Sequence, residues 1–176
     1  MKNQSPKINL ESKPQITIDL DPVLEAYCRF VFQTPPEQKE IVVSRHHDIG
    51  KLIHSNVITR DLPIKESFSA EATVFILPVT QINHHAMKCH FLYVSNWGEQ
   101  KIRDGVEYEF KAWVRQRFEI GYNVKRWDRK TIIETILRGL NLRNNAANFD
   151  TIKKIDYRNR RKIEEMRFQE LLTDCI

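Results

Sequence analysis

The first part of the chain alternates between apolar and polar positions in short runs. Ile16, Ile18 and Leu20 alternate with polar residues, which is the period of a half-buried strand. The pair Asp21-Pro22 then indicates a helix start, because proline in the first helical position gives up no hydrogen bond. Similar patterns predict a helix over 22–32, strands over 40–43, 72–77 and 87–94, a helix over 45–54, a turn over 95–98 and a partner strand over 99–103.

From about residue 105 the apolar positions take up a helical period. Val106, Phe110 and Val114 recur every four residues and predict a helix over about 105–120. The preceding Asp104-Gly105 is also a strong hairpin signal, so a strand is the alternative for this segment.

Two further helices are predicted towards the end of the sequence. Asp128 is a favourable N-cap for the first of them, and Gly139 stands where that helix should end. The last helix is expected to be capped by Asn148 or Asp150 and to continue to about Leu172, with an intermittent apolar stripe.

Together these elements predict an α+β fold. We expect a small mixed or antiparallel sheet with helices, followed by a basic three-helix region with the general layout of a helix-turn-helix. The segment from Gly139 to Asn148 is longer than the tight turn of that motif. The expected parts are a flexible N-terminal tail (1–14), a mixed lobe (15–103) and a basic helical lobe (104–176), with a soft boundary that also permits one continuous domain.

The distribution of charge changes the picture more than its total of +5. The segment from Met1 to Lys88 holds 10 Lys and Arg against 10 Asp and Glu, whereas Cys89 to Ile176 holds 18 against 13. Between Lys111 and Arg167 there are 16 basic residues against 7 acidic ones. A fold that gathers this segment on one face would attract phosphate groups.

Two clusters in this segment are candidates for contact with nucleic acid. Arg158, Arg161 and Lys162 share one face of the last helix, and the second cluster surrounds a helix N-terminus, whose dipole favours an anion. The alternative is a solvated helix, or a helix that docks on an acidic protein. The expected nucleic-acid-binding residues are Lys125, Arg126, Arg129, Lys130, Lys153, Lys154, Arg158, Asn159, Arg160, Arg161, Lys162 and Arg167.

The histidines form two groups, one at 46, 47 and 54 and one at 84, 85 and 90 beside Cys89. Neither group shows a recognised zinc-ligand spacing, so no metal site is predicted. Asp104, Glu109 and Lys111 could support Mg²⁺-dependent cleavage only if they lay on a strand.

The remaining features argue against several function classes. Glycine is scarce, with 5 in the chain, and no phosphate-binding glycine motif occurs, so we expect no cofactor and no catalytic site. The sequence has no run of 18 apolar residues and no apolar signal segment, and its three cysteines are odd in number. We therefore expect a cytoplasmic protein with reduced thiols and no membrane contact.

The leading hypothesis is a non-enzymatic nucleic-acid-binding protein whose partner is double-stranded DNA. The alternative is a structural or assembly subunit, such as a virion or mobile-element component, that docks on protein partners or on itself through exposed aromatic side chains such as Trp97 and Tyr122. A metal-dependent nuclease is the third hypothesis.

Overall fold

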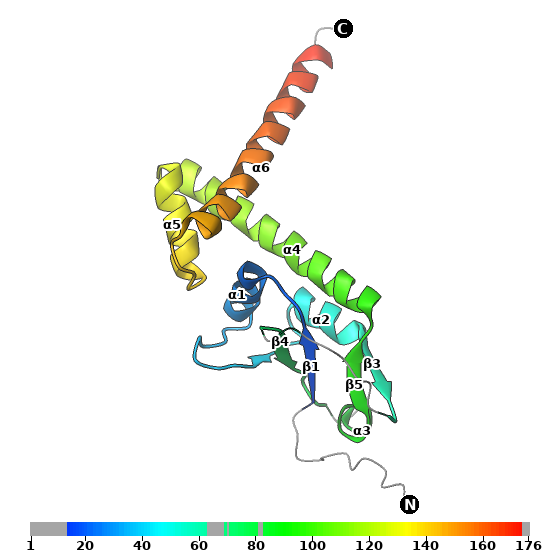
Figure 1. Cartoon of the computed structure of the whole chain (residues 1–176). Helices are drawn as coiled ribbons and strands as arrows, with labels where there is room; N and C mark the ends of the chain where they lie inside the picture. The colour runs from blue at the N-terminus through cyan, green and yellow to red at the C-terminus, as the bar shows by residue number, and fades with distance from the viewer. Residues whose placement is uncertain (1–13, 63–68, 70, 81–82, 174–176) are drawn as a thin grey trace, which may run out of the picture. The chain divides into compact units, whose positions relative to one another are not determined.

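A computed structural model of the chain describes residues 14–62, 69, 71–80 and 83–173 (Figure 1). The predicted N-terminal tail lies outside the described residues except for residue 14. The chain forms two compact units, Met1–Glu107 and Tyr108–Ile176. The elements in chain order are β1 (Gln15–Ile18), α1 (Pro22–Val31), β2 (Ile41–Val42), α2 (Asp48–Ser55), β3 (Val57–Arg60), β4 (Thr73–Ile76), α3 (His84–Cys89), β5 (Phe91–Val94), α4 (Asn96–Glu119), the π-helical turn η1 (Ile120–Val124), α5 (Arg129–Gly139) and α6 (Ala146–Thr173).

The predicted α+β class is confirmed, and the small sheet is mixed. In the first unit β4 is the central strand of a three-stranded sheet, antiparallel to β1 and parallel to β2. Strands β3 and β5 form a separate antiparallel pair. The predicted alternation in β1 is confirmed because Ile16 and Ile18 are buried, and Phe75 of β4 is buried beside them.

The segment between residues 84 and 103 differs from the prediction. Residues 84–89 form helix α3, so the predicted strand over 87–94 shrinks to β5. The expected turn at 95–98 is the start of α4, because the Ser95 Oγ accepts a hydrogen bond from the Gly98 N–H at 3.2 Å. The predicted partner strand over 99–103 is therefore helical, and β5 pairs instead with β3, which no sequence pattern indicated.

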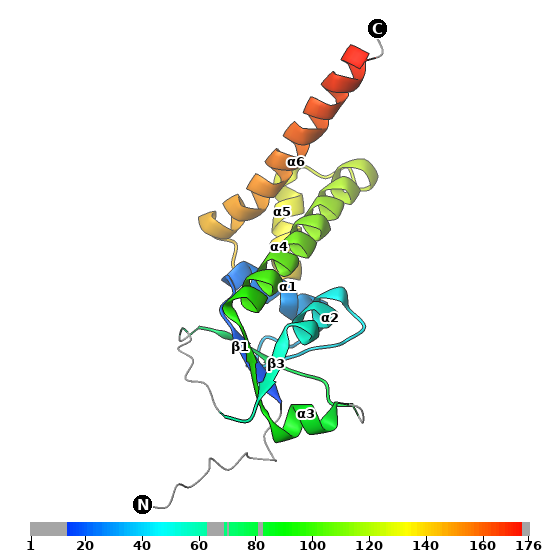
Figure 2. The ribbon, with the colours of Figure 1, turned by 90° about the vertical axis from the view of Figure 1, so that its right-hand side faces the viewer.

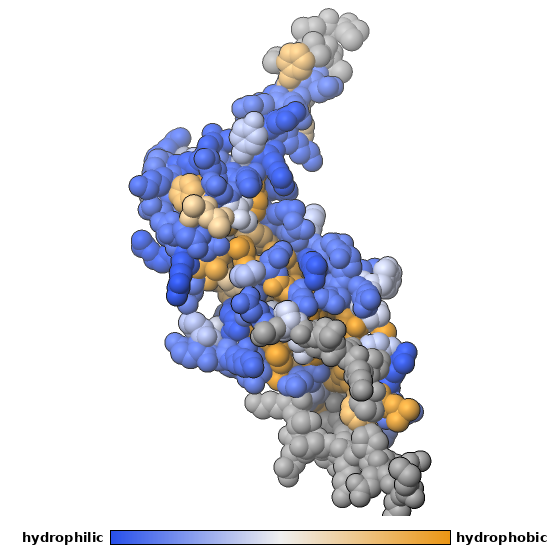
Figure 3. All heavy atoms as spheres, viewed as in Figure 1, coloured by the Kyte–Doolittle hydropathy of each residue, from blue (hydrophilic) through white to orange (hydrophobic). Residues whose placement is uncertain are grey.

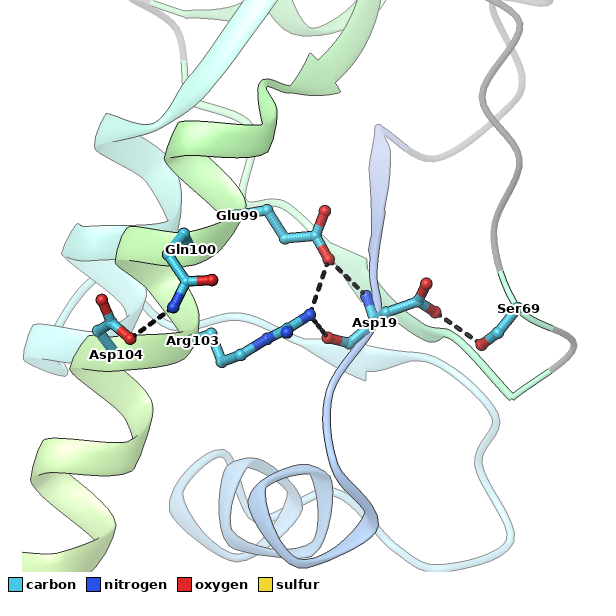
Figure 4. A network of polar contacts seen from close by, with 6 residues as sticks. All are labelled: Asp19, Ser69, Glu99, Gln100, Arg103 and Asp104. Atoms are coloured by element: carbon cyan, nitrogen blue, oxygen red, sulfur yellow. Dashed lines mark hydrogen bonds and ion pairs between the residues drawn. The ribbon is translucent and has the colours of Figure 1, made fainter.

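A network of polar contacts joins the first turns of α4 to the end of β1 (Figure 4). The Arg103 guanidinium donates to the backbone oxygen of Asp19 at 2.7 Å and to Glu99 at 3.2 Å. Glu99 in turn accepts the Asp19 backbone N–H at 3.2 Å, and the Ser69 hydroxyl donates to the Asp19 carboxylate at 2.6 Å. These contacts fix the start of α4 against the end of β1 within the first unit.

In the second unit the second half of α4 continues into η1 instead of ending near residue 120 as predicted. The side chain of Ile132 lies 2.5 Å from where a Cβ at position 121 would be, so only glycine allows α5 to come this close. The chain turns at Arg126, whose φ of 57° is in the left-handed region.

Helix α5 ends at Gly139 as predicted, but its left-handed cap residue lies further along, and α6 is capped by a residue other than those predicted. After α5 the left-handed residue is Asn141, with φ 54°, and the Leu142 N–H donates to the Leu137 oxygen at 2.9 Å. The N-terminus of α6 is capped by Asn145, whose side chain accepts the Asn148 N–H at 2.9 Å. The helix-turn-helix layout is not confirmed. Within the described residues, no helix combines the length and the apolar character needed to cross a membrane.

Candidate nucleic-acid interface

The most buried charge of the second unit is Asp156 on α6, which is only 2 % exposed. Its carboxylate lies 3.0 Å from the Arg129 guanidinium and 3.3 Å from that of Arg160. The Tyr122 hydroxyl donates to the same carboxylate at 3.1 Å, and the Arg160 guanidinium lies 4.1 Å from the centre of the Tyr122 ring. This cluster, the Asp156 cluster, ties η1, α5 and α6 together.

The Asp156 cluster explains part of the basic sequence without any ligand. A hydrogen bond to Tyr122, together with the nearby Asp156 charge, raises the pKa of Arg129 and so stabilises its charged form. Arg129 and Arg160 thus serve the packing of the second unit. Tyr122, expected to be an exposed docking aromatic, is partly buried in the same cluster.

Two further cations on the predicted site have acidic neighbours. Arg161 donates to Glu165 at 2.8 Å, and this pair raises the pKa of Arg161. Lys130 lies 3.9 Å from Glu134. Both pairs are exposed and screened by solvent, so each contributes little to stability and can yield to a phosphate.

The cluster around the start of α5 is less open to an anion than its sequence indicates. Asp128 occupies the N-cap position of α5, and its carboxylate accepts a hydrogen bond from the Thr131 hydroxyl. That hydrogen bond lowers the pKa of Asp128, so a negative charge already sits at this helix end. Lys125 and Arg126 are exposed beside it without an ion pair among the described residues.

One face of α6 carries three cations, and among the described residues only Arg161 of the three has an acidic partner. Lys154, Arg158 and Arg161 are spaced by four and three residues and therefore share this face, opposite the buried Ile152. We call these three residues the basic face, with Lys162 at its edge. Lys154, Arg158 and Lys162 are exposed and make no ion pair within the described part of the chain.

Tyr157 lies beside the basic face with 62 % of its surface exposed. Its hydroxyl can donate to a phosphate oxygen and its ring offers a flat apolar surface. The sequence analysis did not single out Tyr157. Its position three residues after Lys154 and four before Arg161, between two cations on the helix, was a usable signal. Hydrophilic side chains cover most of the α5 and α6 surface seen in Figure 3.

The other predicted residues are spread around α6. Lys153 and Arg167 are exposed on other sides of the helix, and Asn159 is half buried in line with Ile152 and Ile155. The structure therefore brings together only part of the predicted set. The sequence analysis did not identify Asp156 as the centre of a cluster. An acidic residue on the apolar side of a strongly basic helix was the signal that could have found it.

The His85 and His90 rings meet edge to face, with their centres 5.4 Å apart. His90 pairs with Asp61 at 2.8 Å and His54 lies 3.3 Å from Asn83. Burial, together with the nearby Arg45 charge, lowers the pKa of His54. No three His, Cys, Asp or Glu side chains within the described residues come together as metal ligands would.

Two remaining candidates have structural explanations. Asp104, Glu109 and Lys111 lie on helix α4, so the strand that the nuclease hypothesis required is not formed. Cys28 is fully buried, and this burial, with a smaller contribution from Glu25, raises its pKa to about 12. Its thiol is therefore a core side chain.

Comparisons with known proteins add no functional assignment. No family model matches the sequence, and neither the curated proteins nor the solved structures gave a match. What the chain does has to be argued from its own residues.

Proposed function

We propose that the chain is a non-enzymatic nucleic-acid-binding protein that contacts double-stranded DNA through the basic face of α6. The observation that carries this proposal is the pair Lys154 and Arg158, exposed one helical turn apart and free of acidic partners among the described residues. Neither cation is needed to hold the fold, unlike Arg129 and Arg160.

The charge of the second unit supports the same proposal. Tyr108–Ile176 contains 16 Lys and Arg against 10 Asp and Glu, whereas Met1–Glu107 contains 12 against 13. A net positive unit attracts DNA from a distance, and exposed cations on one helix face then contact phosphates. Tyr157 can add a hydroxyl contact to the backbone.

The test is fluorescence anisotropy with a labelled random duplex of about 30 base pairs, at low and at physiological salt. We expect binding that weakens steeply with salt. The double variant Lys154→Gln/Arg158→Gln should bind more weakly and lower the slope of log K against log salt by about two.

The charge-matched control is Arg138→Gln/Arg143→Gln, which removes two exposed cations elsewhere in the second unit. This control should retain most of the affinity. Equal losses in both variants would assign binding to net charge alone, and no binding by the native chain at low salt would overturn the proposal.

A second candidate function is a subunit of a larger assembly. It is favoured by exposed apolar side chains on a charged surface, among them Trp97, whose ring centre lies 3.6 Å from the Lys101 ammonium. Helix α6 carries four of these exposed side chains, Tyr157, Ile163, Met166 and Phe168.

A further inference from the structure

An eleven-residue apolar repeat runs along α6. Ile152 and Ile155 are buried, with exposed fractions of 0 % and 8 %. Ile163 and Met166 stand eleven residues later, with exposed fractions of 37 % and 54 %. Because eleven residues make three helical turns, both pairs lie on one side of the helix. We call Ile163 and Met166 the apolar stripe.

The two pairs have different surroundings within the second unit. Ile152 and Ile155 pack in the core that α6 shares with α5. Both ribbon views show α6 extending past α5, and all residues from Arg160 to Gln169 are exposed (Figures 1 and 2). The same side of the helix that binds a helix in its first half is thus uncovered in its second half.

The charges along α6 change sign at the apolar stripe. Residues 153–162 hold six Lys and Arg against Asp156 alone. Residues 163–173 hold three Glu against Arg167 alone. A helix with this order of charges is complementary to a second copy of itself running in the opposite direction.

We propose that the α6 helices of two copies pair antiparallel through the apolar stripe. Ile163 then faces Met166 of the second copy, and the overlap covers residues 157–172 of each helix, which begins directly after the buried Asp156. Arg167 of the second copy then lies between Arg160 and Glu164 of the first, twice in the dimer.

A parallel pair is disfavoured by the same side chains. Lys162 and Arg167 flank the stripe on its two sides and are five residues apart, the spacing at which flanking charges of parallel helices meet. Two like-charged contacts would form in that arrangement. Asn159, on the same side as the stripe, also restricts the possible registers, as single polar residues do in paired helices.

The first test is sedimentation of the full chain without nucleic acid over a range of concentrations. We expect a species of twice the 20.9 kDa chain mass at high concentration that dissociates on dilution. Ile163→Glu/Met166→Glu should be a monomer throughout. Phe168→Glu, which changes a more exposed apolar position (62 %) on the other side of α6, should still dimerise.

Circular dichroism and thermal unfolding of each variant show that a lost dimer is not a lost fold. A native chain that stays monomeric at the highest concentration overturns the proposal. So does a Phe168→Glu variant that dissociates as fully as the stripe variant.

The second test fixes the direction of pairing. In a Cys89→Ser/Cys175→Ser background, Ile163→Cys and Met166→Cys chains are mixed under mild oxidation. Antiparallel pairing should give mainly the mixed disulfide between the two chains. Predominant disulfides within either single variant would contradict the antiparallel arrangement.

Discussion

Asp156 shows how a single acid divides a basic sequence into structural and available cations. Burying a carboxylate is costly unless it is paired and hydrogen-bonded. Arg129, Arg160 and Tyr122 supply that pairing from three segments of the second unit. Two of the predicted DNA contacts are therefore part of the fold, and the cations on the far side of α6 stay available.

Removing the Asp156 charge should lower the free energy of unfolding. In Asp156→Asn the two guanidinium groups lose their common partner, but they are 39 % and 44 % exposed and can be hydrated. We therefore expect a loss of about 2 kcal/mol, less than for a fully buried pair. Urea unfolding of the native chain and the variant measures it.

Glu165→Gln is the matched control, because it breaks an ion pair of similar length on the same helix. The side chains of Arg161 and Glu165 are 70 % and 60 % exposed, so this variant should change stability far less than Asp156→Asn does. Equal losses in the two variants would mean that Asp156 is not a cluster centre.

At the scale of elements, the apolar period predicted the long helices. It missed the start of α4 and strand β3, which depend on contacts with other residues. The apolar spacing of Ile132, Ile133, Ile136 and Leu137 predicted α5 correctly, because all four side chains face the core. The first turn of α4 contains a Trp-Gly pair that suggested a turn, and only the Ser95 cap shows that it begins a helix. Strand β3 was missed because its pattern is mostly exposed and its partner is distant in sequence.

The candidate site was predictable in its residue types and only partly in its members. Sequence spacing placed Arg158 and Arg161 on one face, as the structure does. It could not show that Arg160 is held by Tyr122, because that contact spans 38 residues and depends on η1. Long-range pairing, more than helix formation, decides which cations are free.

Two glycines differ in the space around their Cα atoms, and replacing each of them tests how closely the helices pack. A Cβ at Gly50 in α2 would lie 1.9 Å from the backbone oxygen of Ser44, whereas a Cβ at Gly139 in α5 would meet nothing within 4 Å. Gly50→Ala should therefore destabilise the chain by about 1–3 kcal/mol. Gly139→Ala should be neutral or stabilising by up to about 1 kcal/mol.

Both variants lower the entropy of the unfolded chain equally, so their difference in urea unfolding isolates the clash at Gly50. Similar midpoints for the two would show that α2 does not approach Ser44 this closely.

At the scale of the whole molecule, the two proposals concern opposite sides of one helix. The apolar stripe continues the line of Ile152 and Ile155, and Lys154, Arg158 and Arg161 lie on the other side. A dimer formed through the stripe therefore carries two basic faces that point away from each other. Such a dimer can hold two DNA duplexes, whereas a monomer can hold one.

The expected result of combining both proposals is DNA bridging. Native chain added to an immobilised duplex should capture a second, labelled duplex, because each dimer presents two binding faces. Ile163→Glu/Met166→Glu should still bind a single duplex and lose the capture. Lys154→Gln/Arg158→Gln should still dimerise, bind each duplex more weakly and capture correspondingly less of the second duplex. Capture that persists in the stripe variant, shown to be monomeric by sedimentation, would separate bridging from the α6 dimer and place a second DNA contact elsewhere on the chain.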